Sequence, residues 1–207
     1  MDNATVRIAA GLRLEAPLVR PHACVFGKTV AVDGHHGLMS CRFGSGRHSC
    51  HNQVNDVLCR DIIKSGTLAT QELHSLCTGS GKRPDGVTQV PWSRGRCLAW
   101  DATCPDTFAE SHIQTSSTLL DQRQQQQKRQ NRRSKYSDIT TGVDFVSVAI
   151  ETSGTWGEQA SDLDQEIGRR IAAVEHEPRS TTFLHQRISV AIDIIIDIII
   201  FTTEGEK

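Results

Sequence analysis

Two aspartates border two short strand-like segments, and this arrangement constrains the fold more than any other feature. Asp85 precedes the β-branched run 86–90, and Asp101 follows the apolar run 97–100. The residues between them, 91–96, contain Pro and Gly, which are typical of a turn between two strands. We therefore expect a hairpin that brings the two carboxylates close together.

Paired carboxylates favour a hard, oxygen-seeking cation such as Mg²⁺, which keeps several waters of its own. One such water can be activated to attack a phosphodiester, so the pair points to hydrolysis of nucleic acid. A purely structural interpretation stays open beside it, because aspartates next to Pro and Gly are common in turns and at strand ends.

The order of motifs around this hairpin resembles that of a known family. Arg83-Pro84-Asp85, a spacer, Trp100-Asp101-Ala102-Thr103 and then Lys135-Tyr136 are similar to the restriction-endonuclease-like domain at the C-terminal end of non-LTR retrotransposon polyproteins. That domain is a branch of the PD-(D/E)xK nucleases. The likeness extends from about Gly11 to Ser189 and includes the segments GLRLEAPLVRPHACV, GRHSCHNQVNDVLCR, KYSDITTGVDFVSVAIETSG and EIGRRIAAVEHEPRSTTFLHQRISV.

The resemblance implies an α/β fold with a restriction-endonuclease-like αβββαβ core. It also implies that Asp85 and Asp101 bind Mg²⁺ or Mn²⁺ and that Lys135 is the catalytic cation. DNA is the implied substrate, with the RNA of the element as a second partner, and the implied location is nuclear. Neither a membrane nor a small-molecule cofactor is expected.

Hydrophobic periodicity agrees with this element order. Residues 49–65 predict a helix, 67–70 a first strand and 145–150 a later strand. A further helix is predicted around residues 163–174. In the first helix, we expect one apolar face of Val54, Val57, Leu58, Ile62 and Ile63, and a solvated face of Asn52, Gln53, Asn55, Asp56 and Arg60. In the last, we expect a core face of Leu163, Ile167, Ile171 and Val174, and an outer face of Glu166, Arg169 and Arg170.

One position departs from the PD-(D/E)xK pattern. Thr103 stands two residues after Asp101, where the pattern has a lysine. A neutral hydroxyl cannot replace an ammonium group near a developing phosphorane charge. Lys135, expected on the helix after the third strand, is the candidate cation. Lys82 and Arg83 are alternatives for contacting the phosphate, and Glu151 either assists the metal or ends a core strand.

A cluster near the N-terminus is similar to the zinc-knuckle-like segment that precedes the nuclease core in the same family. Cys24, His36 and Cys41 are the candidate zinc ligands. Tetrahedral Zn²⁺ needs four nitrogen or sulfur ligands, and Phe26 stands where a second nearby cysteine is expected. The substitutes for the fourth ligand are His22, His35, Cys50 and His51. The alternative is a Gly-rich loop with solvated histidines.

The 207 residues fit one ordinary domain, and 23 basic against 24 acidic residues give no overall attraction to polyanions. With no secretory leader and an odd number of cysteines, we expect an intracellular protein with reduced thiols. The expected organisation is an N-terminal Cys/His segment, 1–47, the endonuclease-like domain, 48–190, and an Ile/Asp tail, 191–207. A Gln/Arg-rich insertion lies at about 120–134. The tail is too charged for a membrane span and is β-branched enough to favour aggregation.

The leading hypothesis is a metal-dependent DNA endonuclease domain that nicks target DNA for insertion of the element. The alternative is a catalytically inactive nucleic-acid-binding remnant, which Phe26, the Gln-rich insertion and the isoleucine tail favour. A third possibility is that the reading frame gives no stable protein.

Overall fold

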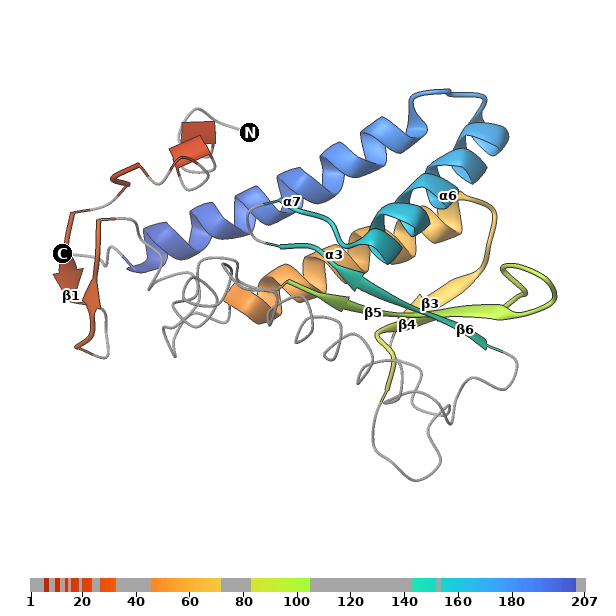
Figure 1. Ribbon diagram of the computed structural model, residues 1–207, viewed down its shortest axis with the longest axis horizontal. Coiled ribbons are helices and arrows are strands. Elements are labelled where there is room, and N and C mark those ends of the chain that lie inside the picture. Colours follow the sequence, from red (N-terminus) through yellow and green to blue (C-terminus); the bar gives the residue numbers. More distant parts are fainter. Residues whose placement is uncertain are drawn as a thin grey trace, which may run out of the picture.

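The predicted hairpin lies at the centre of a mixed four-stranded sheet (Figure 1). β4 (Gly86–Thr88) pairs antiparallel with β5 (Cys97–Thr103), and β3 (Ala69–Gln71) pairs antiparallel with β4. β6 (Val143–Ala149) pairs parallel with β5. The strand order is β3-β4-β5-β6, so the hairpin that carries the two aspartates is flanked on both sides.

The computed structural model describes residues 6–7, 10–11, 14, 16–18, 20–23, 27–32, 46–71, 83–104, 143–151 and 154–203, with side chains described from 50 onward in the first long helix and to 193 in the last. From residue 46 on, three helices accompany the sheet in these ranges: α3 (Gly46–Lys64), α6 (Glu158–Glu175) and α7 (Ser180–Thr203). The chain is therefore a mixed α/β protein.

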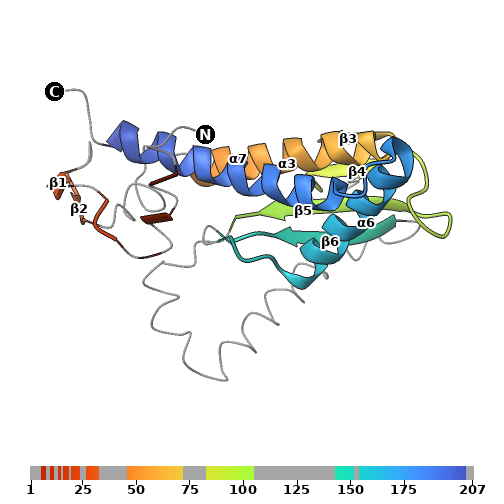
Figure 2. The same cartoon turned by 90° about the horizontal axis from the view of Figure 1, so that it is seen from above.

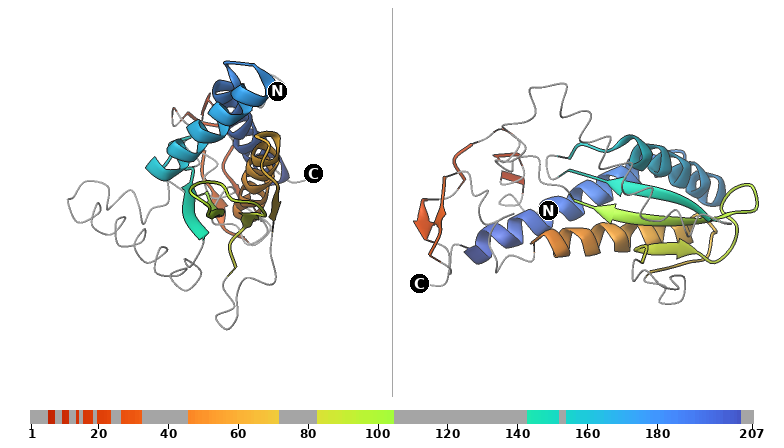
Figure 3. Two further views of the ribbon diagram at one scale, coloured as in Figure 1. Left: turned by 90° about the vertical axis from the view of Figure 1, so that its right-hand side faces the viewer. Right: turned by 60° about the horizontal axis from the view of Figure 1, so that its bottom comes forward.

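The helices pack on one another as well as on the sheet. α6 and α7 form a helical hairpin whose connection begins at His176, a left-handed residue with φ 58° (Figure 1). α3 lies beside α7 along the sheet, and α6 packs against β6 (Figure 2). The views in Figure 3 show the same three helices gathered beside the strands. None of the helices in the described part of the chain is long and apolar enough to cross a membrane.

The core lies between this helical layer and one face of the sheet. β5 alternates, so that Leu98, Trp100 and Ala102 point into the core while Asp101 points to the opposite face. A two-stranded hairpin near the N-terminus, β1 (His22–Ala23) and β2 (Thr29–Val30), adds Val30 to the same core. The core also contains Val54, Leu58, Ile62, Val148, Ile150, Ile167, Ile171, Leu184, Ile188 and Ile192.

The helices predicted at 49–65 and around 163–174 are confirmed, but parts of their predicted faces are wrong. On α3, Ile63 is 46% exposed, because nine residues after Val54 the helix has turned to its opposite side. Asn55 was expected in solvent and is buried, since it lies on the same side as Ile62. On α6, Val174 is 56% exposed, because α3 has already ended opposite it and the nearby Gly66 has no side chain to cover it.

The isoleucine-rich segment continues a helix. α7 runs without a break from Ser180 through the boundary expected at residue 190 and ends at Thr203. Ala191 and Ile192 are buried, and Ile192 belongs to the main core. The first turn of this segment therefore packs as part of the α/β structure.

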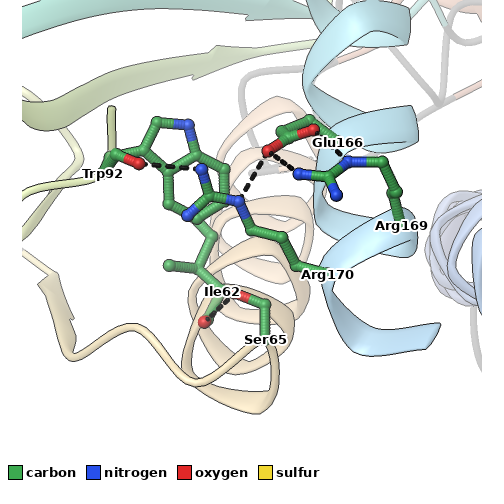
Figure 4. Close-up of polar contacts among 6 residues, drawn as sticks. All are labelled: Ile62, Ser65, Trp92, Glu166, Arg169 and Arg170. Atoms are coloured by element: carbon green, nitrogen blue, oxygen red, sulfur yellow. Dashed lines mark hydrogen bonds and ion pairs between the residues drawn. The ribbon is translucent and has the colours of Figure 1, made fainter. Parts of the chain in front are cut away.

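Arg170 fastens the turn of the central hairpin to α6 (Figure 4). Its Nη2 donates to the Trp92 carbonyl oxygen at 2.7 Å, its guanidinium lies 3.6 Å from the centre of the Trp92 ring, and its Nε pairs with Glu166 at 2.7 Å. The expected solvated position of Arg170 is therefore wrong. Its neighbour Arg169 also pairs with Glu166 but is 68% exposed, as expected.

Below this contact, Ser65 donates to the Ile62 carbonyl oxygen at 2.6 Å and helps to end α3.

Two carboxylates are buried where the three helices meet. Asp61 of α3 accepts from Arg187 at 2.6 Å, and Asp164 of α6 lies 3.4 Å from the Nδ1 of His185. One oxygen of each aspartate, Asp61 Oδ2 and Asp164 Oδ1, is buried without a hydrogen-bond partner. Burial, opposed by His185, raises the pKa of Asp164 to about 6. The ionised form of Asp164 is therefore costly in the folded protein.

Replacing Arg170 with lysine should destabilise the fold by about 1–2 kcal/mol, because an ammonium cannot stack on Trp92 while bonding both Glu166 and the Trp92 carbonyl. Urea denaturation gives the free energy of unfolding. Arg169→Lys is the matched control, since it changes the same residue type beside the same glutamate, and should cost less than about 0.5 kcal/mol. Equal losses for the two variants would contradict the assigned role of Arg170.

Asp164→Asn should stabilise the protein above pH 6 and lose this advantage towards pH 4. The folded pKa of about 6 exceeds the ordinary value of 3.8, so the folded state holds more protons than the unfolded state in this interval and wild-type stability falls as pH rises through it. We expect a gain of about 1–3 kcal/mol at pH 7.5. Thermal unfolding at both pH values tests this, with the exposed Asp162→Asn as control. A gain independent of pH would argue against ionisation as the cause.

Candidate functional site

Asp85 enters the sheet directly beside Trp100. Its backbone N–H donates to the Trp100 carbonyl oxygen at 2.9 Å, and in the following pair Gly86 lies opposite Trp100. A Cβ atom at Gly86 would lie 2.0 Å from the Trp100 ring. Glycine is therefore required after Asp85, because only a bare backbone lets the indole ring lie across β4.

The Asp85 carboxylate has defined neighbours on both oxygens. Oδ2 accepts the Ala102 N–H at 2.6 Å, and Oδ1 lies 3.4 Å from the Nε2 of His51. The side chain of Asp101 lies within hydrogen-bond reach and acts on Asp85 as a like charge. The hairpin thus brings the two predicted carboxylates together.

The electrostatics of Asp85 follow from this position. Burial first, and then the charge of Asp101, raise the pKa of Asp85 to about 6, against the opposing effects of His51 and the Ala102 N–H. Two adjacent carboxylates cannot both ionise without cost. A carboxylate with a perturbed pKa beside a second carboxylate is a common feature of functional sites.

Two residues of α3 that were not assigned to this site hold it in place. His51 contacts Asp85, and its Nδ1 lies 2.9 Å from the Ala102 carbonyl oxygen. Asn55, one turn later, donates to the Asp85 carbonyl oxygen at 3.2 Å and accepts from the Trp100 Nε1 at 2.7 Å. The available signal was the spacing of four residues, which puts both side chains on one face of a helix.

Glu151 is separated from the two aspartates along the sheet. The parallel register of β5 and β6 puts Ser147 beside Asp101, and Glu151 follows four residues later, two residues beyond the end of β6. Thr103 is half-buried at the end of β5, opposite Ala149. The register therefore favours the structural interpretation of Glu151.

Several predicted site residues lie outside the described residues. These are the candidate catalytic cation Lys135, the alternative Lys82 and the candidate zinc ligands Cys24, His36 and Cys41, together with His35 and Phe26.

Three of the substitutes for a fourth zinc ligand are described, and each has contacts of its own. His22 Nδ1 lies 2.9 Å from the Arg20 carbonyl oxygen, His51 contacts Asp85, and the buried free thiol of Cys50 makes a hydrogen bond with the thiol of Cys104. Within the ranges that the structure describes, no group of three or more His, Cys, Asp or Glu side chains is arranged to hold a metal ion.

Comparison with known proteins adds no family to this picture. No protein-family model matches the chain, and a search of curated proteins finds no match either.

Asp85→Asn should stabilise the folded protein at pH 8 but not at pH 4. The folded pKa of about 6 lies above the ordinary value, so the carboxylate destabilises the fold progressively as pH rises from 4 to 6. An asparagine can still accept from Ala102 and removes the repulsion with Asp101, which should add about 1–2 kcal/mol at pH 8.

The measurement is urea denaturation at the two pH values. Asp144→Asn on β6 is a suitable control, because Asp144 pairs with Arg96 at 2.8 Å on a half-exposed surface and its replacement should bring no gain. A loss of stability in Asp85→Asn at pH 8 would mean that the carboxylate is not strained as described.

Proposed function

We propose that this protein is a metal-dependent DNA endonuclease domain derived from a non-LTR retrotransposon, and that Asp85 and Asp101 form its catalytic centre. The observation that carries the proposal is the contact between these two carboxylates at the base of one hairpin, where burial and mutual repulsion raise the pKa of Asp85 to about 6. The order of the motifs in the sequence supplies the reaction class.

The pair fits a divalent cation. Each carboxylate oxygen has two lone pairs, and Asp85 uses one on Oδ2 for the Ala102 N–H. Its remaining lone pairs, with those of Asp101, can serve as the one or two carboxylate ligands that Mg²⁺ commonly takes from a protein. A bound cation would also relieve the repulsion between the two aspartates, and this relief favours cation binding.

When bound, Mg²⁺ or Mn²⁺ would lower the pKa of a water and neutralise charge on the phosphate. The chain itself supplies the orientation. Ala102 fixes Asp85 through its backbone N–H, and the rigid hairpin fixes Asp101. Trp100, fully buried behind them, keeps the two strands from shifting. We assign Lys135 as the group that stabilises the developing negative charge, since Thr103 has no positive charge with which to do so.

The architecture is compatible with a restriction-endonuclease-like core. α3 precedes the antiparallel strands β3, β4 and β5, and β6 joins β5 in parallel. A parallel pair needs a crossover connection of a dozen or more residues, and 105–142 link β5 to β6. This order supports the proposed αβββαβ arrangement, with Lys135 in the crossover.

The 207-residue chain should nick supercoiled plasmid DNA with Mg²⁺ or Mn²⁺, and EDTA should stop the reaction. Asp85→Ala and Asp101→Ala should each reduce cleavage at least about 100-fold, because each removes a ligand of the cation. Lys135→Ala should reduce the rate with little change in DNA affinity, since its charge acts on the transition state. Agarose gels measure nicking, and a filter assay measures binding.

Asp162→Ala, at an exposed position of α6, is the control and should cut like wild type. A folded protein that binds DNA with no cleavage under either metal would overturn the proposal in favour of an inactive nucleic-acid-binding remnant. Cleavage that survives in both aspartate variants would place the catalytic centre elsewhere.

A further inference from the structure

His51 touches the candidate site through both nitrogens of its ring. Nδ1 lies 2.9 Å from the Ala102 carbonyl oxygen. A carbonyl oxygen only accepts, so Nδ1 carries a hydrogen and donates, and in the imidazolium form Nε2 carries a second hydrogen that can be donated to a carboxylate oxygen. Nε2 is thereby directed at Asp85 Oδ1, 3.4 Å away. The ring orientation is fixed by a backbone group that does not depend on the protonation state of Asp85.

The backbone of Ala102 contacts both Asp85 and His51. Its N–H donates to Asp85 Oδ2 at 2.6 Å while its carbonyl oxygen holds His51. Each oxygen of Asp85 therefore has one fixed neighbour, and both neighbours depend on the same residue of β5. Rotation of the carboxylate would lose the Ala102 bond and the His51 contact together.

The helix that carries His51 is itself tied to the same strands. Asn55 joins the Asp85 carbonyl oxygen to the indole N–H of the fully buried Trp100. The His51 side chain is 30% exposed and the Asp85 side chain 18%, so the contact is partly shielded from water. A histidine held at both ring nitrogens and on a fixed helix can restrict its neighbour.

We propose that His51 is a positioning residue that fixes the orientation of the Asp85 carboxylate for a divalent cation. The binding of a cation rests on the proposed function, whereas the interaction between His51 and Asp85 does not. Groups that orient a metal ligand commonly change metal affinity 10–100-fold when they are removed.

Electron paramagnetic resonance of the free ion measures Mn²⁺ binding to the full chain. This measurement tests the effect of His51 on the affinity for the cation. His51→Asn retains a donor where Nδ1 stands but loses the contact with Asp85, and should weaken Mn²⁺ binding about 10-fold or more. His51→Gln places an amide N–H where Nε2 stands, and should retain affinity within about 3-fold. The reverse order would show that only the bond to Ala102 matters and would overturn the inference.

His185→Asn is the matched control. His185 also lies 3.4 Å from a buried aspartate, Asp164, but on α7 and outside the candidate site. It should bind Mn²⁺ like wild type, whereas a loss equal to that of His51→Asn would indicate a general effect on the fold and overturn the inference.

A double-mutant cycle tests the positioning without metal. In urea denaturation with EDTA, His51→Asn should change the unfolding constant about 5-fold more in wild type than in Asp85→Ala, because the contact exists only when both residues are present. Equal changes in the two backgrounds would overturn the inference even if the protein cuts DNA. Coupling in a protein that binds no Mn²⁺ would support the positioning of Asp85 and overturn the proposed function.

Discussion

The burial of one indole ring organises the central part of this structure. Trp100 is fully buried, and an indole N–H in a core needs an acceptor, which Asn55 supplies at 2.7 Å. The same asparagine holds the Asp85 carbonyl, and Gly86 leaves the space that the ring occupies. The tryptophan thus links the first long helix to both strands of the hairpin. The positions of Asp85 and Asp101 depend on this link.

Among the described residues, the carboxylates of the hairpin and those between the helices differ in how their charge is compensated. Asp61, between the helices, receives a guanidinium from Arg187 at 2.6 Å. The described charges that act most on Asp85 are those of Asp101, which repels it, and His51. Asp164 of the helical group also lies near a like charge, that of Asp61, and its pKa is likewise raised to about 6. The hairpin pair differs in exposure, since the Asp85 side chain is 18% exposed and that of Asp164 is 6% exposed.

Local patterns were enough to predict the hairpin, the strand order along the chain and the helices α3 and α6, but not α7. Turn residues at 91–96 and the spacing of Val54, Leu58 and Ile62 act over a few residues, so the sequence alone carries them. The burial of Asn55 and the packing of Arg170 depend on Trp100 and Trp92, which reach them from distant parts of the chain. A polar residue is predicted in solvent unless such a partner is known.

The same limit explains why the sequence presents His51 as a substitute zinc ligand and not as a partner of Asp85. Its nearest polar atoms belong to Asp85 and Ala102, 34 and 51 residues away along the chain. The hairpin register brings these atoms together, because Asp85 bonds to both sides of Asp101 through the backbone of Trp100 and Ala102. Asp85 is therefore bound to the strand on which Asp101 lies, and it cannot move away from that neighbour without breaking both bonds. The repulsion between the two carboxylates is consequently maintained by the backbone, and it raises the pKa of Asp85 together with burial.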